Sequence, residues 1–186
     1  MSTVTELIDT LALPLFFLLL PFIYLRLKGM RLQKALQYLY VNKADFAGWK
    51  GKLSTASNAF ALLVAMLALT TLETVILDSF GLLDLDKVSG LLLRQPPFVL
   101  LIAVMLSPIA EEIFYRGLLQ RRLGVFLSAF LFGASHALYG SVAEILGALT
   151  LGLLLSLYVA RKKSIAAPIF AHMLYNVVAV LSLTGA

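Results

Sequence analysis

Residues 98–119 read FVLLIAVMLSPIAEEIFYRGLL, a mostly apolar stretch interrupted near its middle. A helix needs about 20 apolar residues to cross a bilayer, so this stretch has the length of a transmembrane helix. Three ionisable side chains interrupt it, those of Glu111, Glu112 and Arg116. Each such group costs at least ~2.5–3.5 kcal/mol inside a bilayer on insertion scales. These three side chains therefore need partners or a function.

The rest of the chain repeats this apolar character. Of the 186 residues, 61% are hydrophobic and 13% are charged, and the mean hydropathy is +0.95. This composition is too apolar for a surface that faces water. We predict an all-α, polytopic membrane helical bundle of about six transmembrane helices, forming a single membrane domain over residues 1–186. The predicted spans are Leu11–Leu25, Ala56–Leu77, Phe98–Leu119, Val125–Tyr139, Val142–Ala160 and Ile165–Leu183.

The positive charges gather in three connections between these spans. Residues 26–52, 120–124 and 161–164 hold twelve of the fifteen Lys and Arg residues. Loops rich in Lys and Arg stay on the cytoplasmic side, which predicts a multi-pass protein of the plasma or inner membrane with both termini outside. The net charge of +5 is explained by this topology, and no nucleic-acid partner is expected.

Polar residues of three spans fall at a similar depth. At ~1.5 Å per residue from the predicted cytoplasmic ends, Glu111 and Glu112 lie ~14–15 Å deep and His136 ~20 Å deep. His172 lies ~12 Å deep and Asn176 ~18 Å deep on the same measure. The sequence thus predicts a polar site within the hydrocarbon layer, opening toward the cytoplasmic side.

Spacing within the spans supports this site. Pairs four residues apart share one face of a helix: Glu112 with Arg116, Phe132 with His136, and His172 with Asn176. Pro108 frees a backbone carbonyl beside Glu111 and is expected to kink the helix there. Glu73 and Glu144 fall near the outer ends of their spans, where we expect them to reach water.

Three motifs within residues 106–176 resemble those of the CPBP family of intramembrane proteases, which includes the CAAX prenyl endopeptidases and bacteriocin-processing or immunity proteins. Two glutamates, Glu111 and Glu112, are followed by Arg116. Phe132 precedes His136 by four residues, and the pair His172 and Asn176 completes the set. The resemblance implies a membrane-embedded peptidase surrounded by lipid, acting on a membrane-anchored protein or peptide.

The resemblance also implies roles for the motif residues. Glu111 would be the general base that takes a proton from water. His136, His172 and Asn176 would orient that water and donate to the developing oxyanion. Glu112 and Arg116 would form a supporting pair.

Two questions stay open from the sequence. Glu111, His136 and His172 could instead bind zinc or another divalent metal, with water as a further ligand. The same polar residues could also serve a non-enzymatic membrane scaffold, an immunity protein or a small ion-binding transporter.

Overall fold

The computed structural model describes residues 3–184, and within this range it contains helices and no strand. In lipid the backbone polar groups must be bonded within the chain, and a helix does this segment by segment. The predicted all-α class is therefore confirmed. The predicted single domain also included residues 1–2 and 185–186, which lie outside the described residues, and it stays a prediction.

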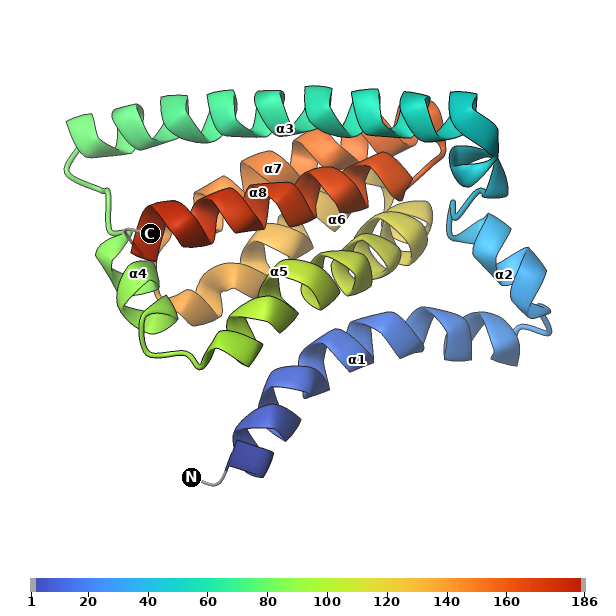
Figure 1. The fold of residues 1–186 in the computed structure, drawn as a ribbon, viewed down its shortest axis with the longest axis horizontal. Coiled ribbons are helices and arrows are strands. Elements are labelled where there is room, and N and C mark those ends of the chain that lie inside the picture. Colours follow the sequence, from blue (N-terminus) through green and yellow to red (C-terminus); the bar gives the residue numbers. More distant parts are fainter. Residues whose placement is uncertain (1–2, 185–186) are drawn as a thin grey trace.

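The elements follow one another as α1 (Thr3–Leu27), α2 (Leu32–Tyr38), η1 (Lys43–Phe46), α3 (Gly48–Ser79), α4 (Asp86–Leu92), α5 (Pro97–Glu111), η2 (Glu112–Leu119), α6 (Gln120–Ser135), η3 (His136–Tyr139), α7 (Val142–Lys162) and α8 (Ala166–Thr184). Helix α3 runs along one side of the bundle and packs against α7 and α8 (Figure 1). Helix α1 lies on the opposite side, against α5 and η2.

Several helices are long and apolar enough to cross a membrane. They are α3, the continuous element Pro97–Tyr139 and α7. Residues Leu11–Leu27 of α1 and Leu32–Tyr38 of α2 are long and apolar enough only when they are taken together, and they are bent by 118° relative to each other. Helix α8 is apolar but shorter. The structure thus supports a helical membrane protein, whereas length and composition alone give three spans, or four with the bent pair, among the described residues. The predicted number of about six stays a prediction.

The element Pro97–Tyr139 is two antiparallel legs rather than one straight helix. Gly124 has a φ of 84° and a ψ of 173°, which breaks the helix at that residue. A positive φ of this kind is easily adopted only by glycine. Beyond the break, Ser128 Oγ donates a 2.7 Å hydrogen bond back to the carbonyl of Tyr115. The predicted separation of the third and fourth spans matches this turn.

Close packing holds the returning leg against α7. A Cβ atom added to Gly133 would lie 2.8 Å from the Cβ of Leu149, and one added to Gly152 would lie 2.9 Å from Cδ1 of Phe132. Real Cβ atoms do not approach so closely, so both glycines are needed for this contact. Small residues allow membrane helices to approach in this way.

The three basic connections meet at one end of the bundle (Figure 1). The guanidinium of Arg121 stacks over the rings of Tyr38 and Tyr40, 4.2 and 4.4 Å from their centroids. The backbone N–H of Ile165 donates to the carbonyl of Tyr40 at 3.2 Å. These contacts join the segment after α1 to the α5–α6 and α7–α8 turns.

At the opposite end, Asp84 caps α7 from the connection between α3 and α4. Its carboxylate accepts hydrogen bonds from Ser141 Oγ at 2.6 Å and from the N–H groups of Val142 and Ala143, both at 3.0 Å. Lys87 adds an ion pair at 3.0 Å. These donors hold the pKa of Asp84 well below its usual range, the bond from Ser141 contributing most.

We expect this cap to stabilise the protein fully above the ordinary pKa of aspartate, about 3.9, and progressively less as the pH falls below it. A depressed pKa means that the folded state loses stability as the pH falls and the carboxylate is protonated. Asp84→Asn should lower the melting temperature in detergent by a few degrees at pH 7, and this difference should shrink toward pH 3.

The matched control is Asp78→Asn, which changes an exposed acid outside the cap. It should melt like the wild type at both pH values. Equal melting of the Asp84→Asn variant and the wild type at neutral pH would contradict the stabilising role of the cap.

Candidate functional site

The backbone widens where the double glutamate lies. Helix α5 contains Pro108, and the segment that follows it, η2, is a π-helix from Glu112 to Leu119. Proline removes a donor from the helical ladder, and single-turn π segments occur frequently at functional sites. The kink at Pro108 stays a prediction, whereas the helix type changes directly after Glu111.

Glu112 and Arg116 form a buried ion pair in this π-helix. Oε1 of Glu112 lies 2.9 Å from Nη1 of Arg116, and both side chains are fully buried. The guanidinium also lies over the ring of Phe132, 4.2 Å from its centroid. The partner predicted for Glu112 from the i, i+4 spacing is therefore the one found.

Glu112 holds a second partner from the far end of the chain. Nδ1 of His172, on α8, lies 3.0 Å from the same oxygen, Oε1. A carboxylate accepts, so Nδ1 carries the proton and donates. Nε2 of His172 then faces Glu111, whose Oε2 lies 3.8 Å away. The structure thus brings Glu111, Glu112, Arg116 and His172 into one chain of contacts.

His136 lies at the end of α6 and is held by its own helix. Its Nδ1 lies 2.9 Å from the carbonyl of Phe132, so the proton is again on Nδ1 and Nε2 is the free nitrogen. The ring stacks on Tyr139 at 5.8 Å. No hydrogen bond or ion pair joins His136 to Glu111 or His172 among the described residues, although both rings lie near the ring of Phe132, at 4.8 and 6.0 Å between centroids.

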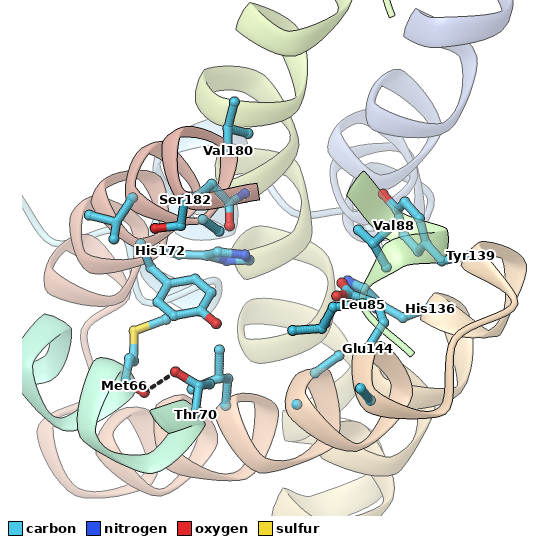
Figure 2. A pocket seen from close by; sticks show the side chains of 18 of the residues that line it. Met66, Thr70, Leu85, Val88, His136, Tyr139, Glu144, His172, Val180 and Ser182 are labelled. Carbon is cyan, nitrogen blue, oxygen red and sulfur yellow. Dashed lines mark hydrogen bonds between the residues drawn. The ribbon is translucent and has the colours of Figure 1, made fainter. Parts of the chain in front are cut away.

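A cavity of about 420 Å³ gathers these groups. Glu111, His136, His172 and Asn176 all line it, whereas Glu112 and Arg116 lie behind its wall. Figure 2 shows His172, Met66 and Thr70 on one side of the cavity and His136, Tyr139 and Glu144 on the other. Nδ2 of Asn176 donates one hydrogen bond of 3.3 Å to the carbonyl of Ala103 on α5.

Glu73 and Glu144, which the sequence predicts to reach water, also line this cavity. Glu144 lies in the first turn of α7, and Glu73 lies on α3 across the bundle. Both are only partly exposed. Helical depth alone indicated the ends of spans, and it carried no information about which side of each helix faces the interior. That both side chains point toward the polar site could be seen only once the helices were placed.

The cavity extends toward the end of the bundle that carries α4. Its lining includes Leu85, Val88 and Leu92 from that connection, together with Ala143 and Ser182. The basic connections lie at the other end (Figure 1). The predicted opening toward the basic, cytoplasmic end stays a prediction, and the lining favours the opposite end.

The predicted metal ligands do not converge on one point. Among residues 3–184 no group of three or more His, Cys, Asp or Glu side chains is arranged to hold a metal ion. Glu111, His136 and His172 offer suitable donor atoms, one carboxylate and two free Nε2 nitrogens. His136, however, forms no hydrogen bond or ion pair with the other two side chains within that range. The described arrangement does not fit the predicted zinc or other divalent metal site.

These features together define a class of protein. It is a helical membrane protein in which a buried carboxylate–guanidinium pair supports a histidine at the wall of an internal polar cavity. A pair of acid and imidazole groups enclosed in lipid is suited to moving protons away from bulk water.

The comparison with known families identifies the class more closely. Residues 93–178 match the family described as type II CAAX prenyl endopeptidase Rce1-like. Every motif residue predicted above lies within this segment, and residues 1–92 lie outside it. No curated protein and no solved structure matches the chain. Residues 93–178 thus match the family suspected from the motifs, and this match supports an intramembrane protease activity in general.

We predict that the ion pair stabilises the fold mainly because each charge would otherwise be buried alone. Glu112→Gln or Arg116→Met alone should cost about 3–5 kcal/mol of unfolding free energy, since the remaining buried charge loses the opposite charge that balances it. The double variant should cost less than the sum of the two. Denaturant unfolding in detergent measures the three values. Additive losses would show that the two side chains are energetically independent.

Proposed function

We propose that the protein hydrolyses a peptide bond of a membrane-anchored protein or peptide, with Glu111 as the base that activates water. The observation that carries this proposal is the arrangement around His172. One ring nitrogen is held by the buried Glu112, and the other faces Glu111 at 3.8 Å on the cavity wall. A water that bridges these two groups would be held between two proton acceptors.

The proposed reaction uses Glu111 twice. Its carboxylate takes a proton from water, and the hydroxide attacks the carbonyl carbon of the substrate to form a tetrahedral oxyanion. The C–N bond then breaks, and the leaving amine takes the proton back from Glu111. The products are a carboxylic acid, which then gives up its proton to water or to the amine, and an amine; no further reactant is needed.

The hydrogen bonds of the two histidines refine their proposed roles. In a neutral ring whose Nδ1 donates, Nε2 accepts, so neutral His136 and His172 are suited to holding water rather than to donating to an oxyanion. Asn176 has one amide N–H bonded to Ala103 and a second one available on the cavity side. We therefore assign the oxyanion donor to Asn176, with a histidine contributing only when it is protonated.

Glu112 and Arg116 are proposed as positioning residues. They do not line the cavity; Glu112 contacts Nδ1 and so fixes the orientation of His172, and Arg116 holds Glu112 in place. Carboxylate groups that hold the far nitrogen of a functional histidine act in this way in many sites. Their effect on the reaction would pass entirely through His172.

The decisive test of Glu111 is the isosteric variant Glu111→Gln. Loss of a general base typically lowers the rate by about 10²–10⁴-fold. Wild type and variant are reconstituted in liposomes with a panel of membrane-anchored peptides, and cleavage is followed by mass spectrometry. Asp86→Asn, an acid outside the cavity, is the matched control and should cleave at the wild-type rate. Equal cleavage by wild type and Glu111→Gln would rule out Glu111 as the base.

We further propose that substrate reaches Glu111 from the end of the bundle that carries α4. The cavity lining at Val88 and Leu92 supports this route. The basic connections at the other end assign α4 to the non-cytoplasmic side by the positive-inside rule. The scissile bond would then lie nearer that side than the depth of Glu111 alone suggests.

The sidedness can be measured cleanly because the chain contains no cysteine. Asp86→Cys in α4 and Lys34→Cys in α2 change two exposed positions at opposite ends. An impermeant maleimide should label Asp86→Cys in intact cells and Lys34→Cys only in inverted vesicles. Labelling of both from one side would contradict the proposed topology. The reverse pattern would place the α4 end in the cytoplasm.

A further inference from the structure

We propose that Glu144 determines substrate specificity by binding a cationic group of the substrate, a Lys or Arg side chain next to the bond to be cleaved. The effect of Glu144 on cleavage rests on the proposed function, whereas its preference for a cationic group can be measured by binding alone, without any reaction. The observations that carry it are the position of Glu144, the absence of a partner for its carboxylate among the described residues, and the acidic side chains that line the cavity around it.

Glu144 faces the reacting groups. It lines the cavity that also contains Glu111 and His136, and it is near enough to interact electrostatically with Glu111 and Tyr139. In Figure 2 it lies beside His136 and Tyr139 on one side of the cavity. A substrate group that contacts Glu144 would therefore lie within a few residues of the bond presented to Glu111.

The carboxylate of Glu144 is not used by the fold. The backbone N–H of Glu144 donates to Ser141 Oγ at 3.1 Å, the first half of a capping box. In a complete capping box the glutamate carboxylate would accept from the N–H of Ser141, and no such bond is formed among the described residues. Ser141 instead donates to Asp84, which already caps the helix. Glu144 is thereby left to face the cavity.

Among the described residues, no Lys or Arg side chain lines this side of the cavity. Its described lining contains Glu73, Glu111 and Glu144 and neither Lys nor Arg. Oε2 of Glu73 is buried without a hydrogen-bond partner. Lys87, the cation of α4, is held by Asp84 and by the carbonyl of Gly140 at 2.9 Å. Carboxylates that are ionised here would present negative potential, which a cleft with low-dielectric walls focuses on its contents.

The walls suit a long basic side chain. Apolar residues such as Met66 and Leu151 line the cavity between its polar groups. Lys and Arg bury their aliphatic stems against apolar surface while the charged end reaches a polar partner. A cation at Glu144 would also supply the charge-assisted hydrogen bond that the carboxylate lacks, worth about tenfold in affinity.

The test measures binding in the Glu111→Gln background, where the proposed base is absent. The protein is placed in nanodiscs of zwitterionic lipid, which avoids attraction of cationic peptides to the bilayer. The probes are two fluorescent leucine–alanine peptides that differ at one central position, lysine in one and glutamine in the other. We expect the lysine peptide to bind about tenfold more tightly.

Variants at residue 144 test whether Glu144 causes the preference for the lysine peptide. Adding Glu144→Gln should reduce the affinity ratio of the two peptides to about one, and adding Glu144→Lys should favour a third peptide with central glutamate. Asp78→Asn, which removes an acid outside the cavity, should leave the ratio unchanged. Equal binding of the lysine and glutamine peptides, absence of binding, or a ratio insensitive to Glu144→Gln would overturn the inference.

Cleavage by the protein with Glu111 intact is followed in parallel. Cleavage without a lysine preference would leave the proposed function standing and remove only the role of Glu144. A lysine preference in binding without cleavage would retain the role of Glu144 in binding and remove the proposed function.

Discussion

A single carboxylate oxygen joins the parts of the candidate site. Oε1 of Glu112 contacts Arg116 on its own helix and His172 on α8, sixty residues away in sequence. In the interior, a charge without a partner is costly, so each of the three groups constrains the other two. The register of α8 against α5 and η2 follows from this contact. Asn176, one turn after His172, is then directed toward Ala103.

The backbone conformation brings these side chains together. A π-helical turn changes the directions in which side chains leave the helix, and it begins at Glu112. The break at Gly124 then returns the chain so that Phe132 lies under Arg116 and beside His172 at 6.0 Å. Glycines in α6 and α7 allow the close packing that keeps Phe132 in place. The polar contacts of the site thus depend on apolar packing one layer behind them.

Much of this could be predicted because membrane helices have simple local rules. Apolar length predicted the helical membrane class, and the i, i+4 spacing predicted the pair of Glu112 and Arg116. The bond from His172 to Glu112 could not be predicted, since it depends on the relative rotation of two helices. The same rotation decides that Glu73 and Glu144, although near the ends of their helices, line the cavity. Helix type was equally hidden, because nothing in the composition of residues 112–119 requires a π-helix.

Hydropathy alone does not determine the number of membrane spans. Hydropathy treats Pro97–Tyr139 as one apolar element, whereas one positive φ at Gly124 folds it into two legs. The sequence suggested this division through Arg121 and Arg122, two charges between apolar runs. A charged pair marks where a chain reaches the membrane surface, although it does not state how sharply the chain turns there.

Helix α3 contributes to the cavity from outside the segment that carries the motifs. It provides one wall of the cavity, from Met66 to Leu77, yet it precedes residues 93–178, which carry the family's motifs. The motif residues and the surface opposite them therefore belong to separate stretches of the chain. Changes in α3 could reshape what the cavity accepts without altering a motif residue.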